Sequence, residues 1–316
     1  MARLFITGVS GLLGLNLALQ VKEEFTVGGG YHEHPVALDS VETVAADLAS
    51  YQSVQETLGA FQPDVIIHTA AYTDVNGCET NHALAKSLNV DSAANVAKVA
   101  AELGAQLVHI STDHLFDGTD PWRTEDDSPK PLNVYAATKL EGELSVAANC
   151  PDALVVRTNF YGWGSPLKPS FSDWILDGLR EDRRLTMFED SFFNPILIND
   201  LADLIVELVK RKAKGVYNVA GRDRLSKYSF AEQLAETFDH STAKIIRSRA
   251  SDQQLDIARP GDLSLAYGKL ETLIERPVPT VVEGLVRLRL LEEKGWPEKL
   301  RKAIGGVKAS QRPMSA

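Results

Sequence analysis

A tyrosine and a lysine four residues apart form the first pair in this sequence whose types and spacing suggest chemistry. Tyr135 and Lys139 stand in the stretch 133–139, NVYAATK, and on a helix this spacing puts both on one face. A phenol with a pKa near 10 is a weak acid–base catalyst until a neighbouring cation stabilises its phenolate. Lys139 can supply that cation and can also reach a cofactor ribose. The same spacing is common on exposed helix faces, so a second element is needed.

The stretch Ser111-Thr112-Asp113 supplies that second element. It closes an apolar run at 107–111, and the carboxyl end of a buried strand is where open α/β sheets bind their ligands. We expect the Thr112 hydroxyl to hydrogen-bond a substrate carbonyl beside Tyr135. The other interpretation is a turn or helix cap in which Asp113 binds local backbone.

A glycine-rich loop follows the first apolar run. Its glycines fall at positions 8, 11 and 14, after a strand pattern and at the start of a helix pattern. This is the context of a dinucleotide phosphate loop, where glycines allow close backbone approach and the helix N-terminus attracts the pyrophosphate. The alternative is a strand-to-helix turn with glycines for geometry alone. The predicted phosphate-loop contacts are Gly8, Ser10, Gly11, Leu12, Leu13 and Gly14.

Two later segments extend the predicted cofactor site. Asp47 and Leu48 end the third apolar run, where a carboxylate and an amide can bind adenine; equally, Asp47 can cap the helix that begins near Tyr51. Small residues after the fourth run leave room for a ligand at the sheet edge. The remaining predicted cofactor contacts are Ala70, Ala71, Tyr72, Asn89 and Ser111, together with Tyr135 and Lys139.

The end of the second run bears on the choice of cofactor. An NAD site usually has an Asp or Glu there to bind the ribose hydroxyl, whereas this chain has Gly28-Gly29-Gly30-Tyr31 at 28–31. His32 or His34 can contact a 2′-phosphate, and Glu33 weakly favours the opposite choice. We expect NADPH, with NADH still open.

These residues need a sheet to bring them together. Apolar runs separated by helical patterns of 10–20 residues indicate βαβ units and a doubly wound parallel sheet of the Rossmann type, with a loop joining the second and third runs. The expected strands are 4–7, 25–29, 43–46, 65–68, 107–111 and 154–158; the expected helices are 12–21, 51–61, 82–103 and 134–148.

The second half has a less regular pattern. It predicts a loop at 163–172, helices at 199–212, 226–238 and 279–293, and a strand at 215–220. The last dozen residues have the composition of a frayed tail. We therefore expect a dinucleotide-binding domain of 1–157 plus about 190–221, a substrate part of about 158–189 plus 222–300, and a tail at 301–316.

Composition narrows the classes of function. The chain has 316 residues, 44% of them hydrophobic, which is enough for a large core. A net charge of -10 argues against general nucleic-acid binding, and no apolar run is long enough to predict a membrane span. Cys78 and Cys150 stand alone, as expected for a reduced cytosolic protein. The first strand pattern begins so early that no signal peptide is expected, and the residue spacing predicts no metal site.

At this point the chain resembles the extended short-chain dehydrogenase/reductases, and within them the dTDP-4-dehydrorhamnose reductase family. The resemblance is strong over the first 165 residues and reaches to about residue 290. The matching stretches are 6–14 (ITGVSGLLG), 68–75 (HTAAYTDV), 111–118 (STDHLFDG), 131–143 (PLNVYAATKLEGE), 157–162 (RTNFYG) and 259–265 (RPGDLSL).

The resemblance implies roles for single residues. Tyr135 corresponds to the general acid, Lys139 to the residue that positions cofactor and tyrosine, and Thr112 to the group that polarises the carbonyl. Phe160 falls where relatives often carry Trp in the sugar pocket, which points to a changed sugar preference. The family's C-terminal segments form a small, discontinuous domain that holds the nucleotide-sugar. The expected substrate contacts are Thr112, Asp113, Asn159, Phe160 and Arg259.

The resemblance implies hydride transfer from NADPH to the C4 ketone of a nucleoside-diphosphate 4-keto-6-deoxysugar. Two alternatives stay open. The chain is also similar to the regulatory beta subunit of methionine adenosyltransferase, which would bind NADP and a partner enzyme without turnover. An epimerase or dehydratase with bound NAD is the other, although only one acid, Asp113, follows Thr112. A homodimer, the sugar and the nucleotide are left open.

Overall fold

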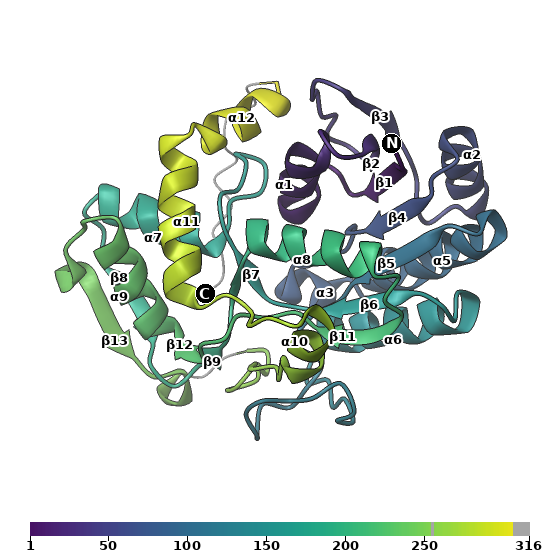
Figure 1. Cartoon of the computed structure of the whole chain (residues 1–316). Coiled ribbons are helices and arrows are strands. Elements are labelled where there is room, and N and C mark those ends of the chain that lie inside the picture. Colours follow the sequence, from purple (N-terminus) through teal and green to yellow (C-terminus); the bar gives the residue numbers. More distant parts are fainter. Residues whose placement is uncertain (254–255, 306–316) are drawn as a thin grey trace.

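A parallel sheet of seven strands forms the centre of the molecule in the computed structural model, which describes residues 1–253 and 256–305 (Figure 1). The strand order is β11-β6-β5-β4-β1-β2-β3, and every neighbouring pair is parallel. The predicted Rossmann-type α/β class is therefore confirmed. The strands are β1 (Arg3–Thr7), β2 (Thr26–Tyr31), β3 (Val41–Ala45), β4 (Val65–His68), β5 (Gln106–Ile110), β6 (Leu154–Arg157) and β11 (Gly215–Asn218).

Alternate residues of each strand face different helices. In β1, Leu4 and Ile6 belong to the core shared with α1 (Leu12–Val21) and α8 (Ile198–Lys210), whereas Phe5 joins the core under α2 (Tyr51–Phe61). Two faces buried by helices require near-continuous apolar strands, which explains the runs in the sequence. The predicted loop between the second and third strands is also present.

The predicted helix at 82–103 is present, but a π-helical turn that the pattern does not predict lies within it. The chain forms α4 (His82–Lys86), a π-helical turn η1 (Ser87–Asp91) and α5 (Ser92–Leu103), preceded by the unpredicted α3 (Val75–Thr80). Helix α6 (Val134–Asn149) crosses η1 so closely that a Cβ on Gly142 would lie 2.4 Å from the Asn89 carbonyl oxygen. The wider turn directs Asn89 toward the site described below, a common use of π turns.

The second half contains more structure than its pattern predicts. Helix α7 (Phe171–Arg180) begins inside the expected loop, because Ser170 and Asp173 form a capping box. The predicted helices correspond to α8, α9 (Lys227–Thr237) and α11 (Val281–Glu293). The other elements are β7 (Phe160–Tyr161), β8 (Leu185–Phe188), β9 (Phe192–Phe193), β10 (Ile196–Leu197), β12 (Leu225–Ser226), β13 (Ile245–Ser248), α10 (Gly268–Ile274), α12 (Trp296–Ala303) and the 3-10 turns at Thr242–Lys244 and Ala250–Asp252.

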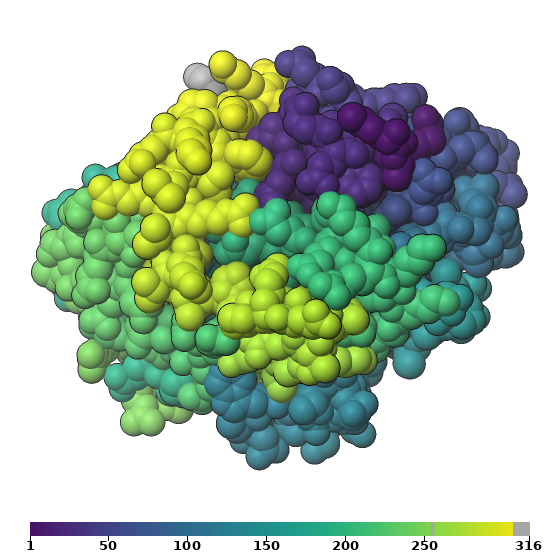
Figure 2. All heavy atoms as spheres, viewed as in Figure 1, coloured from purple at the N-terminus to yellow at the C-terminus, as the bar shows by residue number. Residues whose placement is uncertain are grey.

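The expected tail begins too early. Helix α12 runs to Ala303, and Ala303 and Ile304 are buried, so the predicted boundary at 301 is wrong; residues 306–316 lie outside the described ones. The Ala37 N–H donates to the Ala303 carbonyl at 2.7 Å. Figure 2 shows the yellow C-terminal surface lying directly against the purple N-terminal surface. The split into two domains stays a prediction.

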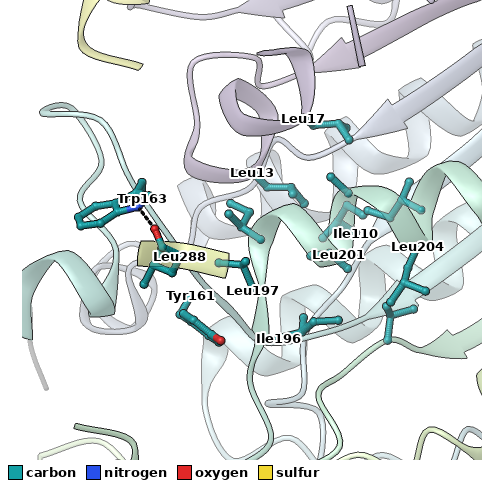
Figure 3. Close-up of a cluster of buried hydrophobic side chains, with 14 of the residues drawn as sticks. Leu13, Leu17, Ile110, Tyr161, Trp163, Ile196, Leu197, Leu201, Leu204 and Leu288 are labelled. Carbon is teal, nitrogen blue, oxygen red and sulfur yellow. Dashed lines mark hydrogen bonds between the residues drawn. The ribbon is translucent and has the colours of Figure 1, made fainter. Parts of the chain in front are cut away.

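Helix α1 is packed between the sheet and the C-terminal segments. Figure 3 shows Leu13 and Leu17 beside the leucines of α8, and Trp163 donating through Nε1 to the Leu288 carbonyl at 2.9 Å. The buried Asn16 of α1 donates to the Trp163 carbonyl at 2.9 Å and accepts from Trp296 Nε1 at 2.8 Å. Among residues 1–253 and 256–305, no helix is long and apolar enough to cross a membrane.

Candidate active site

A cavity of about 560 Å³ opens at the carboxyl edge of the sheet. It lies at the reversal of strand order between β1 and β4, where doubly wound sheets bind ligands. The loops after β1 to β5 and the start of α6 all contribute to its wall. The predicted site residues that line it are Gly8, Ser10, Gly11, Leu12, Leu13, His32, Asp47, Leu48, Ala70, Ala71, Ser111, Thr112, Asp113, Tyr135, Lys139, Asn159 and Phe160.

The glycine loop owes its shape to close backbone approaches. Gly8 has φ +70°, and a Cβ there would lie 2.8 Å from the Ala70 Cα atom; a Cβ on Gly14 would lie 2.3 Å from the Gly8 carbonyl oxygen. Gly11 is the N-cap of α1 and has no side chain to bind the first N–H groups of that helix. N–H groups of this kind and the helix dipole can bind an anion, and this helix start lies at one end of the cavity.

Toward β2 and β3, the wall of the cavity also includes His32, His34 and Asp47. The Asp47 carboxylate accepts the Ala49 N–H at 3.0 Å, while Ser50 caps α2 by accepting the Ser53 N–H. The interpretation of Asp47 as the α2 cap is therefore wrong. Its place in the cavity wall leaves the predicted adenine contact as a prediction.

Asn89 and Tyr72 lie behind the cavity rather than in its wall. Asn89 Oδ1 accepts the Tyr72 N–H at 2.7 Å, and Asn89 Nδ2 donates to the Tyr72 carbonyl at 3.1 Å and to Thr138 Oγ1 at 3.0 Å. Asn89 is buried. Asn89 thus joins the loop after β4 to α6, and its predicted contact with the cofactor stays a prediction. Gly14 likewise acts through packing, as described above.

Two side chains, those of Asn133 and Glu79, fix the start of α6 and with it the position of Tyr135. Asn133 accepts the Ala136 N–H at 2.9 Å, and the Glu79 carboxylate of α3 accepts the Val134 N–H at 2.7 Å. A capped first turn has its orphan N–H groups satisfied. Tyr135 and Lys139 are therefore presented from a rigid helix end, with exposures of 8% and 3%.

Burial shifts the pKa values of both groups. It raises the pKa of Tyr135 to about 12, although hydrogen bonding to the Thr112 hydroxyl lowers it in part. It lowers the pKa of Lys139 to about 8, against the charge of Glu143, which raises it. Lys139 Nζ donates to the Ile110 carbonyl at 2.7 Å. The phenol is thus a proton donor at neutral pH, with an ammonium group on the same helix face.

Thr112 and Asp113 form a buried polar group beside Tyr135. Asp113 accepts from Asn159 Nδ2 at 2.6 Å and from Thr112 Oγ1 at 3.2 Å, which differs from the alternative of bonding to local backbone. Thr112 Oγ1 also accepts the His114 N–H at 3.2 Å, and the His114 ring lies edge-on to Tyr135 at 5.7 Å between centroids. Thr112 and Tyr135 both line the first cavity, and Thr112 would have to turn its O–H away from Asp113 to donate to a carbonyl oxygen bound there.

A second cavity, of about 250 Å³, adjoins the first, and His114 lines both. Arg259 lies here and not in the first cavity, together with Lys227, Phe171 and Trp174, which sequence reasoning missed. Lys227 Nζ lies 3.8 Å from the Phe193 ring centroid. Burial lowers its pKa to about 8, although the Asp113 carboxylate raises it. The second cavity combines two cations with aromatic walls.

Comparison with known proteins places this geometry in a family. The family model "RmlD substrate binding domain" matches residues 2–289. The chain belongs to this RmlD family. A dTDP-4-dehydrorhamnose reductase from Bacillus anthracis, solved in complex with NADP, superposes on the RmlD-family chain with a TM-score of 0.81 at 27% identity, covering 92% of this chain and 99% of that one.

Two curated relatives of this RmlD-family chain have different descriptions. "Probable low-salt glycan biosynthesis reductase Agl14" of Haloferax volcanii is 30% identical over 90% of this chain and 96% of its own length. Methionine adenosyltransferase 2 subunit beta of Mus musculus is 32% identical over 86% of this chain and 82% of its own length. Family membership therefore covers both a reductase and a subunit of another enzyme.

Proposed function

We propose that the chain is an NADPH-dependent reductase of the C4 ketone of a nucleoside-diphosphate 4-keto-6-deoxysugar. One observation carries the proposal: a single cavity joins the anion site at Gly8–Leu13 to Thr112, Tyr135 and Lys139. The structural neighbour that holds NADP and is named a dTDP-4-dehydrorhamnose reductase supports the same cofactor and substrate class. A cytosolic location and a homodimer stay predictions.

NADPH, when bound, supplies the hydride that reduces the ketone. Tyr135 gives its phenolic proton to the oxygen that becomes the alkoxide, a general-acid role. Thr112 donates a hydrogen bond to the same oxygen and stabilises its developing charge. Lys139 holds a positive charge near the phenol, which makes the phenolate left after proton transfer less unfavourable.

The second cavity suits the nucleoside-diphosphate part of this substrate. Arg259 and Lys227 provide positive charge for the diphosphate, and guanidinium is well matched to phosphate oxygens. Phe171 and Trp174 provide flat apolar walls for a base. Because His114 lines both cavities, a substrate in the second cavity can place its sugar beside Thr112 and Phe160 in the first.

A regulatory subunit is the second candidate, favoured by the similarity to the methionine adenosyltransferase subunit. Both candidates bind NADP, so cofactor binding does not separate them. Consumption of NADPH does, and it also excludes an epimerase with bound NAD, which regenerates its cofactor.

The deciding experiment is a panel of 4-keto nucleotide-sugars followed by NADPH absorbance, with NADH in parallel. We expect stoichiometric NADPH oxidation with at least one of them, and loss of nearly all turnover in Tyr135→Phe while its NADPH affinity stays within a few-fold of wild type. The proposal fails if no substrate consumes NADPH, or if Tyr135→Phe keeps near-wild-type turnover.

A further inference from the structure

A third ionisable residue continues the buried face of α6. Glu143 lies four residues beyond Lys139, as Lys139 lies four beyond Tyr135, and its exposure is only 5%. Tyr135 and Lys139 line the first cavity, whereas Glu143 lies outside the described lining of either cavity. A buried carboxylate this close to the site, but out of reach of a ligand, acts through its neighbours.

Arg157 of β6 is one of those neighbours. Its Nε donates to Glu143 Oε1 at 3.0 Å and its Nη2 donates to Oε2 at 2.8 Å, so the guanidinium binds the carboxylate with two nitrogens. Both side chains are 6% exposed. A buried pair of this kind requires good geometry to offset its desolvation, and loss of one partner leaves an uncompensated charge.

Lys139 is the other neighbour. The titratable groups that act on it are Glu143 on its own helix, His68 on β4 and His109 on β5, while Tyr135 lies one turn earlier on α6. Burial and the Lys139 charge lower the pKa of His68 to about 3 and hold the pKa of His109 well below its usual value, so both imidazoles are neutral. Glu143 is therefore the member of this set that carries negative charge at neutral pH.

We propose that Glu143 keeps Lys139 protonated through its negative charge one helix turn away, and that Arg157 limits this effect by placing its own positive charge on the same carboxylate. Both are positioning residues. The proposal rests on the proposed function only where it gives the charge on Lys139 a role in the reaction. The charge itself can be measured without substrate.

Two substitutions should move the titration of Lys139 in opposite directions. Glu143→Gln removes the negative charge and leaves the Arg157 cation, so Lys139 should lose its proton about one pH unit or more lower. Arg157→Met removes the cation bound to the Glu143 carboxylate, so the full negative charge of Glu143 acts on Lys139. The midpoint of the Lys139 titration should then rise. A residue that only supported the fold would not give shifts of opposite sign.

The midpoint is read in two ways on the full chain. One is the pH dependence of NADPH binding, followed by fluorescence; the other is the rate of Lys139 acetylation by acetic anhydride against pH, followed by mass spectrometry. Glu141→Gln, on the exposed side of the same helix, is the matched control and should shift neither. If Arg157→Met does not fold, Arg157→Gln replaces it, because the glutamine amide is uncharged but can still donate a hydrogen bond to the carboxylate, and an upward shift is still required.

Shifts in the same direction, or no shift in Glu143→Gln, overturn the proposal even if the chain reduces a ketone. Conversely, opposite shifts in a chain that consumes no NADPH with any nucleotide-sugar sustain this proposal and overturn the proposed function.

Discussion

At the scale of single residues, burial gives Tyr135 and Lys139 complementary protonation states. The raised pKa of Tyr135, about 12, keeps its proton available through the physiological range. The lowered pKa of Lys139, about 8, places the loss of its charge just above that range. The pair is competent in a window that ends where Lys139 deprotonates.

This window predicts the pH profile of the reaction. Because the Lys139 pKa is lowered, its charge is complete well below pH 8 and is lost as the pH rises through about 8. We expect kcat to fall about tenfold per pH unit above that midpoint, measured with NADPH at saturation. A rate that stays level to pH 10 would contradict the assignment of Lys139.

Much of this site could be predicted from local sequence. The glycine loop, Thr112, Tyr135 and Lys139 each end a strand or begin a helix, and a Rossmann sheet collects such ends at one edge. Lys227, Phe171 and Trp174 could not be found in this way, because they lie at the starts of α9 and α7 rather than at the ends of strands of the large sheet. The short strands beside these helices give no periodicity that would place them at the site. The hydrogen bonds of Asn89 to Tyr72 and Thr138 could not be predicted, because helical periodicity does not reveal a π turn.

At the scale of elements, the loop before α1 depends on the contact between Gly14 and the Gly8 carbonyl. Gly14→Ala would set a methyl group 2.3 Å from that oxygen, so either the loop or the helix must move. We expect NADPH affinity to fall at least tenfold and the free energy of unfolding to drop by about 1–3 kcal/mol. Isothermal titration and urea denaturation measure the two effects.

Gly59 in α2 provides the control for this prediction. A Cβ atom at Gly59 would have no described heavy atom within 4 Å. Gly59→Ala should therefore leave NADPH binding unchanged and stabilise the protein by about 0.5–1 kcal/mol, since alanine is the better helix former. Equal effects of the two substitutions would mean that the contact with Gly8 is unimportant.

At the scale of the whole molecule, the two cavities divide the work of binding. The first is built mainly on the sheet, and the second on segments of the second half of the chain. Because His114 lines both cavities, the proposed substrate and cofactor would lie next to each other although different parts of the chain would bind their charged groups.

This division predicts separable defects. Lys227→Met should raise KM for the nucleotide-sugar at least tenfold, because it removes a charge from the second cavity, while NADPH affinity stays within twofold. Steady-state kinetics and NADPH titration provide the two numbers. A Lys227→Met protein with weakened NADPH binding and unchanged KM would place the diphosphate elsewhere.

The hydrogen bonds of Asn16 predict a stability effect on the whole chain. Asn16→Leu would leave the Trp163 carbonyl and Trp296 Nε1 without this partner in a buried region. We expect a loss of about 2–6 kcal/mol in the free energy of unfolding, at about 1–3 kcal/mol for each of the two groups left unsatisfied. Trp296→Phe, which leaves the Trp163 bond intact, should lose less in the same urea denaturation.

Asn16 also lies on the helix whose N-terminus is proposed to bind the cofactor phosphates, five residues after Gly11. A ligand that stabilises this helix also stabilises the segments that Asn16 binds. The coupling free energy is the same in both directions, because coupling between two sites is reciprocal. Bound NADPH should therefore slow amide hydrogen exchange in α12, at the far end of the chain. Equally, a chain truncated so that it ends before Trp296 should bind NADPH more weakly, although residues 296–305 do not line either cavity.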